Sequence, residues 1–177
     1  MPIRPRRKAT ALLVFLALVP LLVAACSSSG GTPTGDTRSG FMSVKQYDAA
    51  LKQDYAKFSW PAHRQPDLDS LFRQTQPPSD SHGGSPLLQA GYQDLILGLT
   101  NQCAWYLAWN DAHSAGDKAD EKAALKVMTD VIPNLPTLDP AGKQFAISAA
   151  QKAALGDGTT AMQVVQGNCS DTTWKST

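Results

Sequence analysis

Apolar side chains recur every three or four residues along most of the chain, which is the spacing that places them on one face of an α-helix. The first such stretch follows Ser43, whose hydroxyl can cap a helix together with Gln46 three positions later. We therefore predict a helix over residues 43–58. It ends at Trp60-Pro61, because the residue before a proline is disfavoured in helical geometry.

The next stretch, residues 59–84, is rich in Pro, Ser, Gln and Gly and has no regular apolar spacing. This composition is typical of an extended connection between helices. Only Leu68, Leu71 and Phe72 lie at helical spacing, and they predict a single short turn of helix within the connection.

A long helix is predicted after this connection. Ser85 is suited to cap it and Pro86 to fill its first position, and the helix runs to His113 or Ala115, before Gly116. Its large apolar side chains fall in one stripe, which we expect to face the core: Leu88, Tyr92, Leu95, Leu99, Cys103 and Tyr106. Polar side chains gather on another side: Gln89, Gln93, Thr100, Asn101 and Asp111.

Three shorter helices follow, and caps, prolines and glycines set their predicted bounds. The first begins after Asp117 and ends at or before Pro133, the second begins at Asp139-Pro140 and ends near Gly156, and the last covers residues 159–167. No run of alternating β-branched residues bounded by hairpin turns follows the N-terminal segment. The predicted fold is therefore all-α, a single small bundle of four to five helices with a long central helix.

The first 26 residues have a different pattern. Four basic residues between positions 4 and 8 precede about 14 mainly apolar positions, from Ala9 to Leu22, fewer than the roughly 20 that a membrane-spanning helix needs. The sequence Val23-Ala24-Ala25-Cys26 follows directly, before a run rich in Ser, Gly and Thr.

This segment resembles the signal peptide and lipobox of bacterial lipoproteins. The resemblance implies that the peptide is cut before Cys26 and that acyl chains are attached to the sulfur and amino group of this residue. It also implies that the protein is held on the outer, extracytoplasmic face of the cell membrane by its lipid. An uncleaved signal anchor and an ordinary secretory signal are the alternatives. The resemblance implies nothing about the fold or ligand of the remaining chain.

Three segments follow from this division: a cleaved signal peptide at 1–25, a lipidated cysteine and flexible tether at 26–42, and a helical domain at 43–177. A tether of about 15 flexible residues reaches roughly 20 to 25 Å, which holds a domain off the lipid surface. The whole chain has 16 basic and 15 acidic residues, and four basic ones leave with the signal, so the mature chain has 12 against 15. The resulting formal charge of −3 gives no reason to expect nucleic acid.

Two cysteines remain in the predicted domain, Cys103 and Cys169. In an exported protein we expect such a pair to form a disulfide, which here joins the C-terminal region to the long helix. Closing a loop of about 65 residues stabilises the folded state by roughly 4 kcal/mol in the chain-entropy model. The alternative is a catalytic cysteine, which needs a nearby histidine in an electropositive pocket.

Two tryptophans of the long helix, Trp105 and Trp109, lie one turn apart and away from the predicted core stripe. Together with Asn101 and Gln102 they form the candidate binding surface, because indoles commonly anchor interfaces and stack on sugars or peptides. The alternative is that the helix is central and covered on several sides, so that these side chains pack beneath its neighbours.

Residues suited to catalysis are few. The histidines are His63, His82 and His113, and Asp80 and Asp111 each precede one of them by two residues. This spacing is a weak signal, because side chains two residues apart on a helix face different directions. The sequence lacks paired zinc-ligand motifs, phosphate-binding glycine loops and a nucleophile elbow. We therefore predict no catalytic residue, no metal and no cofactor.

Two functions are compatible with these patterns. The preferred hypothesis is a membrane-anchored envelope lipoprotein that acts as a non-catalytic binding module for a protein, peptide or glycan of the cell envelope. The alternative is a small lipid-anchored cell-wall hydrolase that uses one of the histidines as base and Asp80 or Asp111 as its helper. This alternative requires loops to converge in a way that the sequence does not predict.

Overall fold

The structure is a computed structural model that describes residues 40–78 and 86–175. Its α-helices are α1 (Val44–Asp54), α2 (Leu68–Thr75), α3 (Tyr92–Ala115), α4 (Lys118–Asp130), α5 (Pro140–Ala154) and α6 (Thr159–Asn168). The other described elements are the strands β1 (Phe41–Ser43) and β2 (Leu87–Gln89) and the 3-10 helices η1 (Tyr55–Lys57) and η2 (Ile132–Asn134). The predicted signal peptide, Cys26, Asp80, His82 and Ser85 lie outside the described residues.

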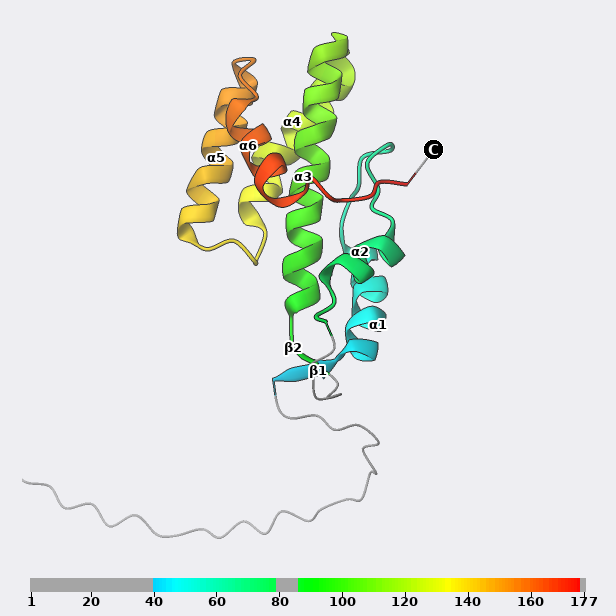
Figure 1. Cartoon of the computed structure of the whole chain (residues 1–177). Coiled ribbons are helices and arrows are strands. Elements are labelled where there is room, and N and C mark those ends of the chain that lie inside the picture. Colours follow the sequence, from blue (N-terminus) through cyan, green and yellow to red (C-terminus); the bar gives the residue numbers. More distant parts are fainter. Residues whose placement is uncertain (1–39, 79–85, 176–177) are drawn as a thin grey trace, which may run out of the picture. The chain divides into compact units, whose positions relative to one another are not determined.

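The all-α prediction is confirmed, and α3 is the central helix. It packs against α4, α6 and α1, while α5 packs against α4 and α6 (Figure 1). The described residues contain six α-helices where four or five were expected, because the single turn predicted around Leu71 is a complete helix, α2. Asp67 caps this helix, and its Oδ1 accepts the backbone N–H of Ser70 at 2.7 Å.

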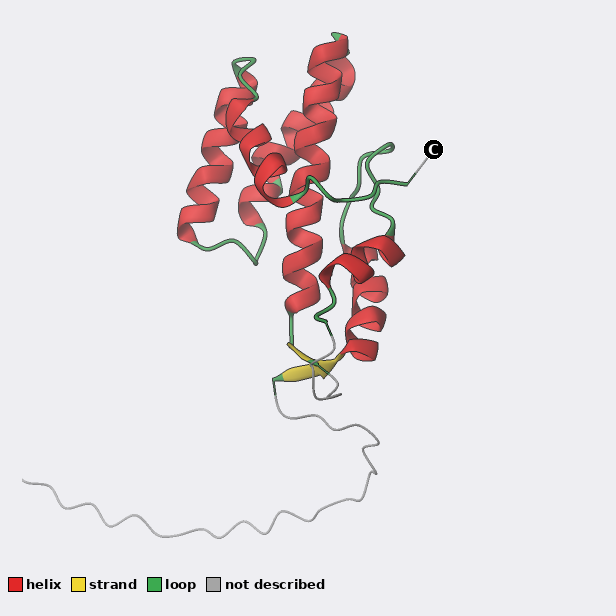
Figure 2. Cartoon of the chain, viewed as in Figure 1, coloured by secondary structure: helices red, strands yellow, loops and turns green. Residues whose placement is uncertain are grey.

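A small antiparallel sheet departs from the sequence prediction of no strands. β1 pairs with β2 (Figure 2). In this pairing Met42 lies opposite Leu88. Each strand has only three residues, which is too short for an alternating pattern to be recognised. Phe41 and Met42, assigned above to the tether, belong to β1.

The long helix begins later than predicted, at Tyr92 and not at Pro86. Residues 87–89 are strand, and the chain then turns through Gly91 at the start of the helix. The φ angle of Gly91 is 89°, a left-handed conformation that glycine adopts without strain. The predicted core residue Leu88 is buried, but it lies in β2 and not in the long helix.

The starts of the other predicted helices are confirmed, whereas α1 ends at Asp54 and the remaining part of the predicted range 43–58 contains the 3-10 helix η1. The Gln46 N–H donates to Ser43 Oγ at 3.3 Å and the Ser43 N–H donates to Gln46 Oε1 at 2.7 Å, which completes the capping box of α1. Asp117 caps α4 and Asp139 caps α5. The C-terminal end of α3 is followed by Gly116, whose φ angle is 71°.

The predicted faces of α3 are partly wrong. Leu95, assigned to the core stripe, is 47% exposed, whereas Gln93, Thr100 and Asn101, assigned to a polar side, are buried. The cause is that several elements cover α3, so its buried polar side chains must find partners inside the protein. Gln93 Nε2 donates to Asp54 Oδ2 at 3.1 Å, and the Thr100 hydroxyl donates to a backbone carbonyl one turn earlier at 2.8 Å.

Asp54 is a buried carboxylate at the end of α1. Lys57 Nζ lies 2.7 Å from its Oδ1. The hydrogen bond from Lys57 lowers the pKa of the Asp54 carboxyl most, and the bond from Gln93 lowers this pKa further. The charged form is therefore favoured, and its bond to Gln93 connects α1 to α3.

Two groups of buried apolar side chains lie along α3. The larger group joins Tyr106 and Trp109 to Met128 of α4 and to alanines of α5. The smaller group lies between the N-terminal half of α3, the sheet, α1 and α2, and consists of Tyr47, Leu51, Leu71, Leu88 and Leu97. The long central helix is thus the element that both cores share.

The predicted disulfide is present. Cys103 in the middle of α3 is bonded to Cys169, the residue that follows α6, with an S–S distance of 2.00 Å. Both cysteines are buried in the larger core. Because the bond engages both thiols, neither cysteine is a nucleophile in this oxidised form.

Candidate functional site

The segment that follows η1 is held against α3 by two hydrogen bonds to one carbonyl oxygen. Trp105 Nε1 donates to the Ser59 carbonyl at 2.9 Å, and Asn101 Nδ2 donates to the same oxygen at 2.7 Å. The two donors lie one turn apart on α3, so both can reach this oxygen. Two members of the predicted binding surface therefore fix the start of the connection at residue 59.

Residues 60–64 are held at both ends. The Trp60 ring stacks on the Tyr55 ring with centroids 5.0 Å apart and an interplanar angle of 11°, and its Nε1 donates to the Tyr55 carbonyl at 3.2 Å. At the other end, Arg64 Nη2 lies 2.5 Å from Asp111 Oδ2 on α3. These contacts fix a loop that the sequence pattern predicts only as an extended connection.

A cavity of about 440 Å³ lies between residues 60–64, α3 and α4, and we call it the Trp105 groove. Its apolar walls consist of two indoles, a proline and a set of alanines: Trp60, Pro61, Ala62, Trp105, Ala108, Ala112, Ala115, Ala123 and Ala124. Small side chains on both helices leave space between them that larger ones would fill. The volume lies within the usual range of ligand sites.

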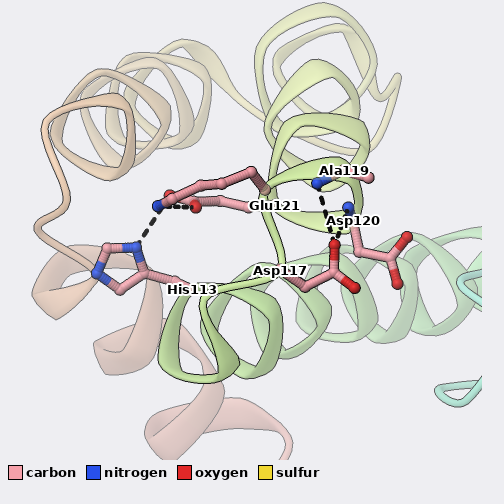
Figure 3. A network of polar contacts seen from close by, with 6 residues as sticks. His113, Asp117, Ala119, Asp120 and Glu121 are labelled. Atoms are coloured by element: carbon pink, nitrogen blue, oxygen red, sulfur yellow. Dashed lines mark hydrogen bonds and ion pairs between the residues drawn. The ribbon is translucent and has the colours of Figure 1, made fainter.

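The polar lining of the groove is mainly acidic. It consists of His63, Arg64, Asp111, Asp117 and Asp120. One arginine against three aspartates gives a formal charge of −2 when His63 is neutral. Asp111 is paired with Arg64, and Asp117 Oδ1 accepts two backbone N–H groups at the start of α4 (Figure 3). The exposed Asp120 carboxylate forms no hydrogen bond or ion pair with the described residues.

The candidate binding surface is corrected in three of its four residues. Trp109 is 1% exposed, and Asn101 and Gln102 are also buried. Trp109 packs in the larger core, and Gln102 Nε2 donates to the Tyr106 hydroxyl at 2.9 Å. They are buried because neighbouring elements cover α3 on more than one side. Trp105 is half-buried, lines the groove and stays a candidate.

Other residues of the groove were not predicted. From the sequence, Trp60 is recognised only as the residue before Pro61 that ends the first helix, and Arg64 lies in a stretch with no regular apolar pattern. The alanines of α3 and α4 carry no chemical signal of their own. The cavity results from the packing of distant segments, so no local pattern indicates it.

A second polar arrangement lies at the C-terminal end of α3. His113 Nδ1 lies 2.9 Å from Glu121 Oε1 on α4, and Lys118 Nζ donates to Glu121 Oε2 at 2.7 Å (Figure 3). The bond from Lys118 lowers the pKa of the Glu121 carboxyl most, followed by the bond with His113. Asp111, the suggested helper of His113 in a hydrolase, is instead paired with Arg64.

His113 also borders a second cavity, of about 520 Å³, between the C-terminal half of α3, α6 and the turn before α6. We call it the α3–α6 cavity. Its lining residues are Trp109, Asn110, His113, Gly156, Gly158, Thr159, Met162, Gln163 and Gln166. The His113 and Trp109 rings stack with centroids 4.9 Å apart. This cavity was not predicted from the sequence.

Neither cavity contains a set of metal ligands. In residues 40–78 and 86–175, no three His, Cys, Asp or Glu side chains lie close enough together to bind a metal ion. In the same residues, no helix has the length and apolar character needed to cross a bilayer. Comparisons of the chain with protein-family models, curated proteins and solved structures find no match.

Proposed function

We propose that this protein is a lipid-anchored envelope lipoprotein that acts as a non-catalytic binding module, with the Trp105 groove as its binding site. The main observation is the groove itself, a cavity of about 440 Å³ that is lined by the Trp60 and Trp105 side chains and by alanines of α3 and α4. Hydrogen bonds and an ion pair hold residues 59–64 in place. A preformed site loses little conformational entropy on binding.

The walls of the groove favour a peptide segment of an envelope protein as the ligand. Indole and alanine surfaces gain free energy when an apolar side chain covers them, and indoles are frequent anchors of protein interfaces. The acidic lining, with Asp120 exposed and unpaired among the described residues, favours a basic side chain next to the apolar one. A peptide with an apolar and a basic residue side by side matches both features.

The location of the module rests on the lipobox resemblance of Val23-Ala24-Ala25-Cys26. An acylated Cys26 places the domain outside the cytoplasmic membrane, where the disulfide between Cys103 and Cys169 is stable. The tether of about 15 residues that the sequence predicts would, as a flexible chain, reach roughly 20 to 25 Å from the lipid surface.

Photo-crosslinking in native membranes tests this proposal. A photoreactive phenylalanine at Ala123, an exposed residue that lines the groove, is expected to capture a discrete envelope protein. The same group at Lys122, which is exposed on α4 but does not line the groove, is the matched control. Equal capture from both positions, or none from Ala123, contradicts the proposal.

Replacing Trp105 by alanine separates binding from folding. We expect the captured peptide segment to bind at least about tenfold more weakly, because truncation of an indole that acts as an interface hot spot costs about 2 kcal/mol or more. Trp105 is half-buried, so the domain should still fold with native circular dichroism and a closed disulfide. Calorimetric titration with the captured segment measures the change. Unchanged affinity in a folded variant rules out the Trp105 groove as the site.

A further inference from the structure

The α3–α6 cavity has features of a second ligand site, independent of the Trp105 groove. Its polar side chains are amides, a hydroxyl and an imidazole: Asn110, Thr159, Gln163, Gln166 and His113. None of the described residues that line it is Asp, Glu, Lys or Arg. The cavity therefore offers hydrogen bonds without a fixed charge, which contrasts with the acidic lining of the groove.

The amides of the cavity are free to bind a ligand. Asn110 projects from α3, and Gln163 and Gln166 project from α6. Within the described residues, these three side chains form no hydrogen bonds with protein atoms. Each amide offers both donors and an acceptor. Two helices thus present such groups to the same space.

Contacts outside the cavity determine the hydrogen-bonding character of His113. Lys118 donates to the Glu121 carboxylate. Because an ionised carboxylate only accepts hydrogen bonds, the 2.9 Å contact between His113 Nδ1 and Glu121 Oε1 makes Nδ1–H the donor. A neutral His113 then has its acceptor at Nε2. This edge of the ring faces the turn before α6, since a Cβ atom added at Gly156 would lie 3.5 Å from His113 Cε1 and 4.0 Å from Nε2.

Trp109 gives a second, independent indication of a ligand. It lines the cavity and is 1% exposed, yet its indole N–H has no hydrogen-bond partner among the described residues. A buried donor without a partner is rare in folded proteins. The indole also approaches Gly158 so closely that an added Cβ would lie 2.6 Å from Trp109 Cζ3. The turn before α6 therefore brings its backbone close to this ring.

From these observations we propose that the α3–α6 cavity binds an uncharged carbohydrate. Sugar hydroxyls both donate and accept hydrogen bonds, and so match amides, a threonine hydroxyl and an oriented imidazole. The part-exposed His113 ring, supported from behind by the buried Trp109 indole on which it stacks, supplies a flat surface of the kind that packs against a sugar ring. An anionic ligand would require the arginines or lysines that are missing from the lining. The volume of about 520 Å³ is within the range of small-molecule sites.

Ligand-detected NMR on the full-length protein in detergent tests this inference. The probes are three neutral trisaccharides, maltotriose, cellotriose and triacetylchitotriose, and a charged one, trigalacturonic acid. We expect saturation transfer to at least one neutral probe at millimolar concentration and none to the charged probe. Absence of transfer to all three neutral probes, or equal transfer to the charged one, overturns the proposal.

Variants on α6 assign the signal to this cavity. Replacing both Gln163 and Gln166 by alanine should weaken sugar binding at least about tenfold, because two amides that can contact the ligand are lost. Gln144→Ala, on an exposed position of α5 outside the cavity, is the matched control and should bind as the wild type does. Trp105→Ala should also retain sugar binding, which separates this site from the Trp105 groove. Binding that survives in a folded Gln163→Ala, Gln166→Ala variant contradicts the assignment.

Discussion

Replacing Trp109 by alanine is expected to lower the free energy of unfolding by about 3 to 5 kcal/mol, the usual cost of truncating a large buried aromatic side chain. Trp109 is almost completely buried in the larger core. It also stacks on His113 and packs against Gly158, so its removal leaves a space between α3 and α6 that small rearrangements cannot fill. Urea denaturation followed by circular dichroism measures the change.

Trp105→Ala is the matched control for this experiment, because the two indoles lie one turn apart on the same helix. Trp105 is half-buried and lines the groove, and its truncation should cost clearly less than that of Trp109. Equal losses of stability in the two variants contradict the assignment of Trp109 to the core and of Trp105 to a part-exposed wall of the groove.

Removing the disulfide is expected to lower the free energy of unfolding by a similarly large amount. Cys103 and Cys169 are separated by 66 residues, and a loop of this size corresponds to about 4 kcal/mol in the chain-entropy model. A domain with a stability of roughly 5 to 15 kcal/mol would lose a large part of it. The comparison is between the oxidised protein and a variant in which both cysteines are replaced by alanine, each unfolded in urea.

Treatment of the wild type with a reducing agent provides the control for the double alanine variant. Both forms lack the cross-link, so they should unfold at similar urea concentrations. Because the bond connects Cys169, next to the C-terminal residues, with α3, the reduced protein should also show faster amide exchange in α6. A midpoint that is unchanged by reduction contradicts the proposed contribution of the disulfide.

Local signals predicted the helices well. The capping residues Ser43, Asp117 and Asp139 and the glycine at 116 each act within one helical turn, so a short stretch of sequence is enough to recognise them. The pairing of the two cysteines was predictable from their number and from the expected oxidising compartment.

The faces of α3 could not be predicted from its own sequence. A single apolar stripe is expected when one side of a helix is covered, but α3 contacts α1, α4 and α6. Asn101 is buried because the Ser59 carbonyl, 42 residues away, accepts its hydrogen bond. Such partners depend on long-range packing, which also creates the Trp105 groove and the α3–α6 cavity.

The central helix lines two cavities of different character. Trp105 faces a groove with an acidic lining, whereas Trp109 and His113 border a cavity with a neutral polar lining. The proposed ligands differ accordingly: a peptide with apolar and basic residues in the groove, and an uncharged sugar in the cavity. Both ligand classes occur outside the cytoplasmic membrane, where the lipobox resemblance predicts the domain to be.

Lipid attachment at Cys26 is the premise on which the envelope location and the choice of partners depend. Mass spectrometry of the protein purified from its native membrane tests this premise directly. The predicted result is an N-terminal peptide that begins at Cys26 and carries the added mass of acyl chains. A protein that retains residues 1–25, or that begins near Cys26 without acyl chains, contradicts it.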